Sequence, residues 1–79
     1  MTAPLAATID IGTNSVRLLV ADLASSPPRA IERLTTITQI GEGLDRDGVI
    51  HAAGAERTAA AVERFARRAT ELGATPRLH

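Results

Sequence analysis

Two neighbouring segments near the start of the chain have the hydrophobic spacing of β-strands. In residues 5–11 every second side chain is apolar, namely Leu5, Ala7, Ile9 and Ile11. The alternate positions are small until Asp10, and a strand that is apolar or small on both faces favours an interior place in a covered sheet. Residues 15–23 are rich in strand formers, and residues 12–14 (Gly-Thr-Asn) are typical of a turn. This pattern predicts a β-hairpin.

A third strand is predicted after a second turn. Residues 24–28 contain two prolines, which cannot donate to a sheet ladder and therefore indicate a bend. Residues 29–40 include a Thr-rich run of strand formers. Their apolar spacing is not strictly two, because Ile31 and Ile37 share one face while Leu34 lies on the other. We therefore predict a bulged strand at an edge of the sheet.

Residues 53–72 change to the spacing of an amphipathic helix. The predicted buried stripe consists of Thr58, Val62, Phe65, Ala69 and Leu72, widened by Ala55, Ala59 and Ala66. A solvated face is predicted on the other side, formed by Arg57, Arg64, Arg67, Arg68 and Glu71. Glu63 and Arg67 are spaced for an i,i+4 ion pair. Gly73 suits the position after the last helical residue, and Pro76 prevents continuation.

Composition and charge limit the classes of protein to consider. With 79 residues the chain is at most one small domain, and 44% hydrophobic residues are enough for a packed fold. Nine acidic and nine basic residues give no net charge, which argues against nucleic-acid binding and a basic membrane-binding patch. The absence of cysteine excludes disulfides and thiolate metal sites. No apolar run approaches the roughly 20 residues of a membrane helix. The N-terminus has no basic segment typical of a signal peptide, so we expect a cytoplasmic protein.

The turn between the first two strands gathers groups that can bind an anion. A tight turn directs several backbone N–H groups to one point, and Gly12 lets a ligand approach the backbone closely. The hydroxyls of Thr13 and Ser15 and the side-chain amide of Asn14 add further donors. These four residues predict a phosphate-binding turn.

Two charged residues flank this turn. Asp10, at the end of the first strand, can hold a hydrated divalent cation, through water when the cation is magnesium. Arg17 lies two residues after Ser15, so it shares the same face of the strand and can reach the same anion. Together with the turn, these residues describe a site for a phosphate group.

Simpler interpretations stay open at this point. The turn can be only a hairpin, Asp10 a turn-capping residue and Arg17 a solvated charge. Residues 41–48 lack the spacing and the final Glu of a calcium loop, so they predict a solvated loop. His51 and His79 have no partner at metal-ligand spacing and are expected at the surface.

The first hairpin resembles the opening signature of a known enzyme family. Residues 9–22, Ile-Asp-Ile-Gly-Thr-Asn-Ser-Val-Arg-Leu-Leu-Val-Ala-Asp, are similar to the start of the exopolyphosphatase and guanosine pentaphosphate phosphohydrolase (Ppx/GppA) family. The resemblance continues through residues 40–48, Ile-Gly-Glu-Gly-Leu-Asp-Arg-Asp-Gly, and into the Ala-rich helix. Sugar kinases and actins, which belong to the same superfamily as this enzyme family, share the Asp-x-Gly turn but rarely the Asn-Ser-x-Arg that follows. The resemblance covers nearly all of the chain from Ala7 to Ala74.

The resemblance implies release of terminal phosphate from inorganic polyphosphate, or of the 5′ phosphate from guanosine pentaphosphate, with magnesium and a homodimeric parent enzyme. Catalytic roles would fall on Asp10 and Arg17, with Asp10 holding the metal through water. The phosphate-binding residues would be Gly12, Thr13, Asn14 and Ser15, with Arg17 beside them. A sugar or acetate kinase of the same superfamily and a non-catalytic phosphate-binding module are the alternatives.

Two departures from the family pattern bear on activity. Gln39 stands where close relatives often have Arg, which puts a second cationic contact at that position in doubt. The sequence also lacks the second, Gly-rich phosphate loop and the acidic general base of the family. We therefore expect the chain to be inactive alone.

The predicted fold class is α/β, the N-terminal part of an actin-like ATPase (ribonuclease H-like) domain. Three antiparallel strands are predicted at residues 5–11, 15–23 and 29–40, followed by one helix at 53–72. Residues 1–79 would form an incomplete N-terminal subdomain of the phosphatase domain. The chain is expected to stop before the strand that pairs with the first one. That would leave the first strand open from Leu5 to Ile9, as a template for self-association.

Overall fold

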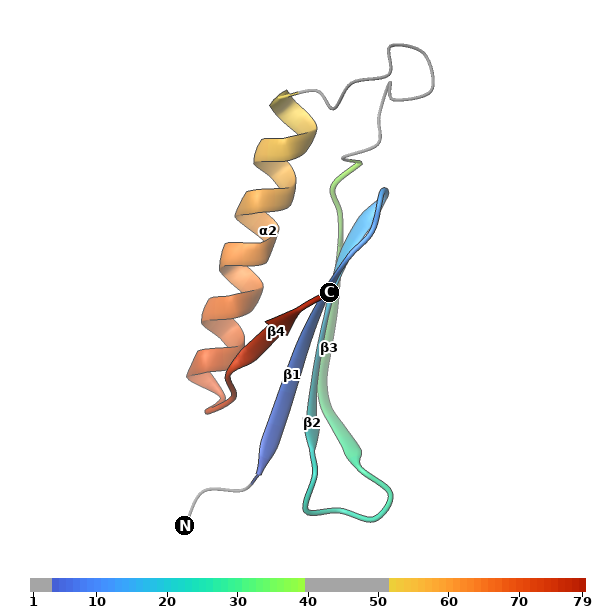
Figure 1. Ribbon diagram of the computed structural model, residues 1–79, viewed down its shortest axis with the longest axis vertical. Coiled ribbons are helices and arrows are strands. Elements are labelled where there is room, and N and C mark those ends of the chain that lie inside the picture. The colour runs from blue at the N-terminus through green and yellow to red at the C-terminus, as the bar shows by residue number, and fades with distance from the viewer. Residues whose placement is uncertain (1–3, 40–51) are drawn as a thin grey trace.

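Within residues 4–39 and 52–79, a long helix packs against a mixed β-sheet (Figure 1). The structure is a computed structural model that describes residues 4–39 and 52–79. Its elements are β1 (Leu5–Ile11), β2 (Ser15–Asp22), β3 (Arg29–Ile37), α2 (Ala52–Glu71) and β4 (Pro76–Leu78). The predicted hairpin, third strand and helix are therefore present, and the α/β fold class is confirmed.

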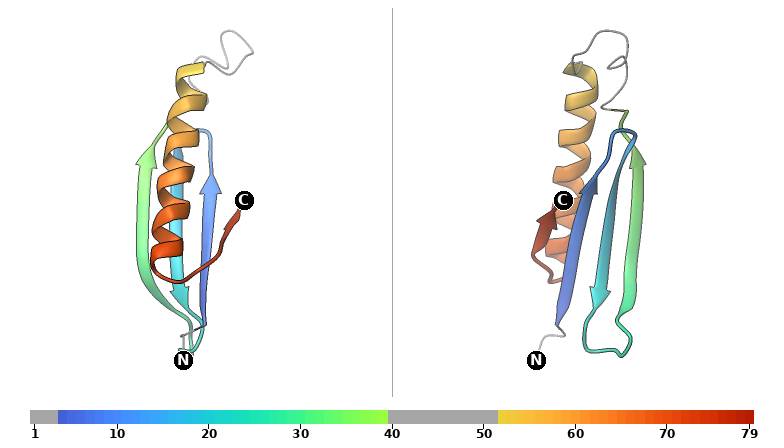
Figure 2. Two further views of the ribbon diagram at one scale, coloured as in Figure 1. Left: turned by 90° about the vertical axis from the view of Figure 1, so that its left-hand side faces the viewer. Right: turned by 45° about the vertical axis from the view of Figure 1, so that its right-hand side comes forward.

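The sheet has the strand order β3-β2-β1-β4. β1 pairs antiparallel with β2, and β2 pairs antiparallel with β3, whereas β4 runs parallel to β1. α2 lies across one face of this sheet, as the two side views show (Figure 2). Asp10 and Arg17 are cross-strand partners in the first ladder, which places both side chains on the same face of the sheet.

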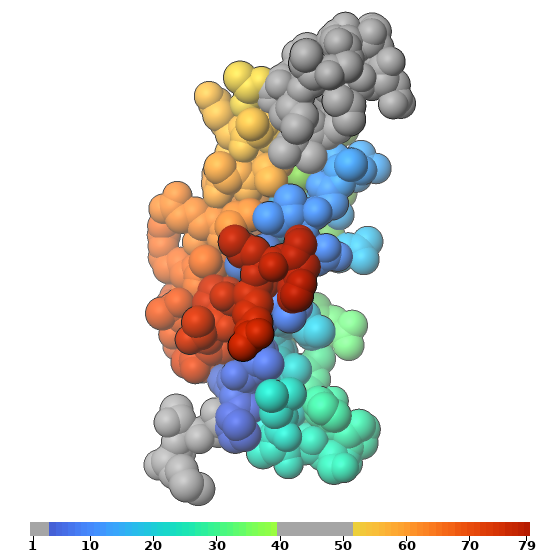
Figure 3. All heavy atoms as spheres, in the orientation of Figure 1, coloured from blue at the N-terminus to red at the C-terminus, as the bar shows by residue number. Residues whose placement is uncertain are grey.

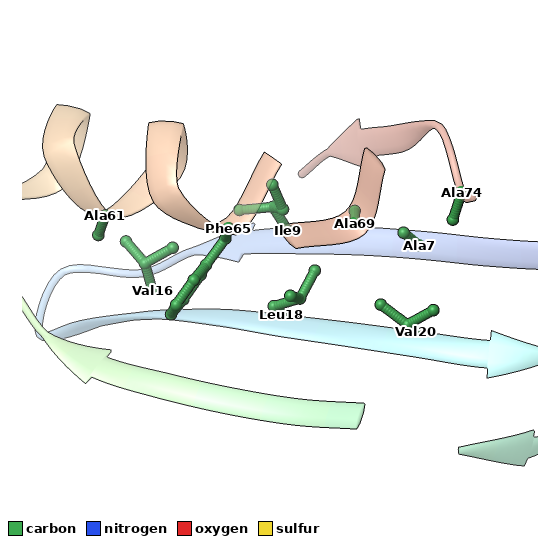
Figure 4. Packing of buried hydrophobic residues seen from close by; sticks show 9 residues of the cluster. All are labelled: Ala7, Ile9, Val16, Leu18, Val20, Ala61, Phe65, Ala69 and Ala74. Atoms are coloured by element: carbon green, nitrogen blue, oxygen red, sulfur yellow. The ribbon is translucent and has the colours of Figure 1, made fainter. Parts of the chain in front are cut away.

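The hydrophobic core lies between α2 and the facing side of the sheet. Its members are Ala7, Ile9, Val16, Leu18, Val20, Ala61, Phe65, Ala69 and Ala74, all buried. Phe65 extends from α2 toward β2 between Val16 and Leu18 (Figure 4). The period-two pattern of β1 and β2 therefore turns four large apolar residues to the helix, namely Ile9, Val16, Leu18 and Val20. Burying a side chain such as Phe65 contributes about 1.5–3 kcal/mol.

β3 is a bulged edge strand, as its irregular apolar spacing predicted. Val20 pairs with Glu32 and Ala21 pairs with Ala30, so Ile31 has no partner in the β2–β3 register. The strand ends at Ile37, earlier than the residue 40 predicted from the sequence. The end of the expected strand at residue 40, the loop at residues 41–48 and His51 lie outside the described residues.

The expectation that β1 has an open edge was wrong. β4 pairs with it in parallel, through Ala7 with Pro76, Thr8 with Arg77 and Ile9 with Leu78. His79, exposed as expected, continues the ladder through its backbone, because its N–H donates to the Ile9 carbonyl at 2.8 Å and its carbonyl accepts from Ile11 at 2.9 Å. Figure 3 shows these last residues lying against both α2 and β1. Pro76 is tolerated because it begins the strand.

The helix buries a slightly different stripe from the predicted one. Its buried residues are Gly54, Thr58, Ala61, Phe65 and Ala69. Val62, Ala66 and Leu72 are half-buried against this core, as predicted, but Ala55 and Ala59 are exposed. Gly73 has the left-handed conformation expected after the last helical residue, with φ 91°. No helix among the described residues is long and apolar enough to cross a membrane.

The predicted solvated face is exposed at four of its five positions, and Arg68 is half-buried. Three of its arginines nevertheless reach the end or side of β3. Arg57 bonds the Thr38 carbonyl, and Arg64 lies 3.5 Å from the Thr36 hydroxyl. Arg68 makes two hydrogen bonds to Glu32, at 2.6 and 3.1 Å, which lower the pKa of that carboxyl. Arg67 stays on the exposed side and pairs with Glu63 at 2.9 Å, as predicted.

Candidate functional site

The turn between β1 and β2 is closed by a backbone hydrogen bond. The N–H of Gly12 donates to the carbonyl of Ser15 at 2.9 Å. A Cβ atom at Gly12 would lie 3.3 Å from that same oxygen, tighter than an ordinary contact. The turn therefore favours glycine at this position because a side chain would push against the Ser15 carbonyl. Glycine at position 12 is thus favoured by the geometry of the turn itself, in addition to letting a ligand approach closely.

The turn is also fastened to the end of β3. The carbonyl of Asn14 accepts hydrogen bonds from the N–H groups of Thr38, at 2.9 Å, and Gln39, at 3.1 Å. Gln39 has the left-handed φ of 54°, which turns the chain as it leaves the strand. Arg57 of α2 in turn donates from Nε to the Thr38 carbonyl at 2.7 Å. The helix, the end of β3 and the turn are therefore joined through Thr38.

All six residues predicted for the phosphate site line one hollow of about 280 Å³ at this turn: Asp10, Gly12, Thr13, Asn14, Ser15 and Arg17. Two neighbouring strands and their turn bring them together. Ser15 is half-buried and the other five are exposed, so a ligand can reach them from solvent. The structure thus shows that these residues are neighbours.

The two charges of the hollow face each other across the β1–β2 ladder. Within residues 4–39 and 52–79, neither Asp10 nor Arg17 makes an ion pair within 4.0 Å. The Arg17 guanidinium is therefore open to an anion, which it can bind with two parallel hydrogen bonds. The Asp10 carboxylate is likewise open to a cation.

A second hollow of about 400 Å³ adjoins the first on the sheet face away from α2. It shares Asp10 and Arg17 and is further lined by Thr8, Leu18, Leu19, Arg33, Leu34 and Thr35. Sequence reasoning missed Arg33 and Thr35 as site candidates. The alternation along the strand places Arg33 and Thr35 on the same face as Ile31 and Ile37. The sequence did not show, however, which face of the sheet the helix covers.

Magnesium fits this site only if water and phosphate supply most of its ligands. Asp10 is the one carboxylate that lines the hollow, and the described residues contain no group of three or more His, Asp or Glu side chains placed to hold a metal. Magnesium is commonly bound by one or two carboxylates together with water and substrate phosphates. The donor set therefore suits a water-mediated cation shared with a phosphate and does not form a cage made by the protein alone.

The four-stranded sheet and the helix that covers it match the N-terminal part of the actin-like α/β domain in Ppx/GppA structures. The Ppx/GppA phosphatase of Aquifex aeolicus has the same fold, with a TM-score of 0.87 and 24% identity, over 94% of this chain and 25% of the other. An exopolyphosphatase from Cytophaga hutchinsonii gives a TM-score of 0.85 and 21% identity, over 95% of this chain and 24% of the other.

Sequence comparison points the same way. The chain is 38% identical to Exopolyphosphatase 2 of Mycobacterium tuberculosis over 64 residues, which are 76% of this chain and 20% of that protein. No family model matches the chain. The chain spans about a fifth of the length of this curated relative. Its sequence and its fold confirm the predicted resemblance: the chain is similar to the Ppx/GppA phosphatases.

Proposed function

We propose that this chain provides the first phosphate-binding turn of an exopolyphosphatase-type phosphohydrolase, an enzyme that releases terminal phosphate from polyphosphate or guanosine pentaphosphate. The main support for this proposal is that one exposed hollow is lined by Asp10, residues 12–15 and Arg17. The relatives named as exopolyphosphatases support phosphoanhydride substrates. The parent enzyme is proposed to be a homodimer, by resemblance alone.

The turn and Arg17 bind the terminal phosphoryl group in this proposal. Backbone N–H groups of the turn and the hydroxyls of Thr13 and Ser15 donate to its oxygens. Arg17 adds charge-assisted hydrogen bonds, which contribute roughly 1.5–3 kcal/mol each. As negative charge shifts among the phosphoryl oxygens during hydrolysis, donors that are already in place stabilise it without reorganisation.

Asp10 is proposed to hold a hydrated magnesium ion beside the phosphate. Bound magnesium neutralises phosphate charge and helps to orient the reacting phosphoryl group. The role of this chain's own carboxylate is to accept hydrogen bonds from the water around the cation and to fix its position next to the turn. Asp10 has no ion-pair partner among the described residues that would compete for it.

We place phosphate binding, not hydrolysis, in this chain by itself. The hollow is lined by one carboxylate, Asp10, which the proposal assigns to the cation. Hydrolysis also needs a base to take a proton from the attacking water, and no second carboxylate lines the hollow. The same observation favours a non-catalytic phosphate-binding module as the second candidate. Release of inorganic phosphate from tripolyphosphate by the chain would favour the enzyme, and binding without release would favour the module.

The proposal is tested by calorimetric titration of the chain with inorganic tripolyphosphate in the presence of magnesium. The Arg17→Ala variant should bind roughly 10-fold more weakly or worse, since it loses a charge-assisted contact. Arg29→Ala is the matched control, because Arg29 is an exposed arginine at the opposite end of the β2–β3 ladder, where its register partner is Asp22. Equal affinities for the wild type and Arg17→Ala would remove Arg17 from the site.

A further inference from the structure

We propose that Arg33 forms a second phosphate position next to Arg17, so that the site takes a chain of linked phosphates in preference to a single phosphate. This inference rests on the proposed function and specifies its ligand as a condensed phosphate. It assigns a binding role to a β3 residue on the sheet face opposite α2. The ligand would extend from the turn along this face, across β2 toward β3.

The sheet register places the two arginines at successive positions along this path. Asp10, Arg17 and Thr35 are aligned across β1, β2 and β3. The next aligned set on the same face, two residues farther from the turn, is Thr8, Leu19 and Arg33. Arg17 and Arg33 are thus diagonal neighbours on adjacent strands, about 7–8 Å apart at the backbone and within reach of long side chains.

Both arginines are exposed and lack ion pairs within the described part of the chain. Two arginines of α2 differ, because Arg67 pairs with Glu63 and Arg68 pairs with Glu32. Arg17 and Arg33 line the same 400 Å³ hollow, where Asp10 is the one carboxylate. Two positive charges and one negative charge leave this hollow cationic, which complements an anion with several charges.

The polar surface also has an end, which limits the length of ligand it contacts. Beyond the set that contains Arg33, the next residues of β1 and β2 on this face are Ala6 and Ala21, which pair with each other. Neither alanine has a side-chain group that can bind phosphate. The contacts therefore run from the turn to Arg17 and on to Arg33, and we expect affinity to rise with each phosphate up to tripolyphosphate.

The test is to measure the affinity of the 79-residue chain for inorganic phosphate, pyrophosphate and tripolyphosphate under the same magnesium and salt conditions. Wild-type affinity should increase in that order. Arg33→Ala should bind inorganic phosphate within about twofold of wild type but lose roughly 10-fold for tripolyphosphate, the effect of one charge-assisted contact. Arg33→Gln, which keeps most of the side chain, should show the same loss. Arg29→Ala should behave as wild type.

The two proposals fail in different ways. If Arg33→Ala and Arg33→Gln keep the full preference for tripolyphosphate while Arg17→Ala loses it, the second position is refuted and the proposed function stands. If the wild-type chain binds none of the three anions, the proposed function fails and the second position with it. Arg33 lies outside the hydrophobic core, so its variants should unfold at the wild-type temperature. An unchanged melting temperature would show that a loss of affinity is not caused by loss of the fold.

Discussion

The guanidinium of Arg57 on α2 donates a 2.7 Å hydrogen bond to the carbonyl of Thr38, the residue whose own N–H bonds the Asn14 carbonyl in the turn. Two hydrogen bonds in series therefore connect the helix to the candidate phosphate site. Thr38 is buried, so solvent does not compete easily for its backbone groups. Arg57 is in this sense a positioning residue, which acts on the turn through the end of β3.

Removing this connection should weaken anion binding more than it weakens the fold. We expect Arg57→Ala to bind tripolyphosphate several-fold more weakly, because the turn loses the support that fixes its N–H groups. Arg57→Lys should recover part of the affinity, since an ammonium group can donate to the same carbonyl but lacks the planar fork.

Arg68→Ala is the matched control for Arg57→Ala. It breaks another contact between α2 and β3, the paired hydrogen bonds to Glu32, away from the turn. Arg68→Ala should lower the melting temperature to a similar or greater extent yet leave the affinity unchanged. Should both variants lose affinity in proportion to their lost stability, the positioning role of Arg57 would be refuted.

Gly12→Ala tests the close approach of the turn backbone. The new Cβ would lie 3.3 Å from the Ser15 carbonyl, so the turn must shift by a few tenths of an ångström. We expect a loss of about 1 kcal/mol in the free energy of unfolding, together with weaker tripolyphosphate binding. Gly73→Ala, at φ 91° after α2, should cost about the same stability without affecting binding. Chemical denaturation and titration of both variants measure the difference.

Thr38 also carries a buried hydroxyl without a hydrogen-bond partner in the described structure. An unsatisfied buried hydroxyl is unfavourable, so Thr38→Val should be neutral or should stabilise the fold by up to about 1 kcal/mol. Thr58→Val is the control, because the Thr58 hydroxyl donates to the Gly54 carbonyl at 2.9 Å and its loss should destabilise. A clear loss of stability in Thr38→Val would show that its hydroxyl is satisfied in solution.

The Glu32–Arg68 pair should make stability depend on acidity. Hydrogen bonds from Arg68 hold the pKa of the Glu32 carboxyl below its usual range. The stabilisation from this pair is therefore complete above the pKa that Glu32 has in the unfolded chain. It is lost as the pH falls through the lower pKa that Glu32 has in the folded chain. Thermal unfolding at a series of acidic pH values should show a smaller decline for Glu32→Gln than for wild type.

Local features of this fold could be predicted from the sequence because each lies within one short segment. β1, β2 and their turn follow a period of two with a glycine between them, and the six candidate site residues fall within residues 10–17. The ion pair of Glu63 with Arg67 follows from helix geometry alone.

Features that depend on distant segments could not be predicted in the same way. Glu32 and Arg68 are 36 positions apart, and their contact depends on how α2 crosses the sheet. β4 has only three residues, too few to show a period, and Pro76 argues against a strand unless it begins one. Arg33 became a site candidate only when the structure showed that α2 covers the opposite face.

Mapping the ligand on the isotope-labelled chain by NMR is the strongest test of whether the turn between β1 and β2 binds phosphate. On titration with tripolyphosphate and magnesium, the largest shifts should fall on the backbone amides of residues 12–17. The amides at the solvated side of α2, such as Arg67, should change least. Shifts centred on the arginines of α2 or on β4, or no shifts at saturating ligand, would contradict phosphate binding by this turn.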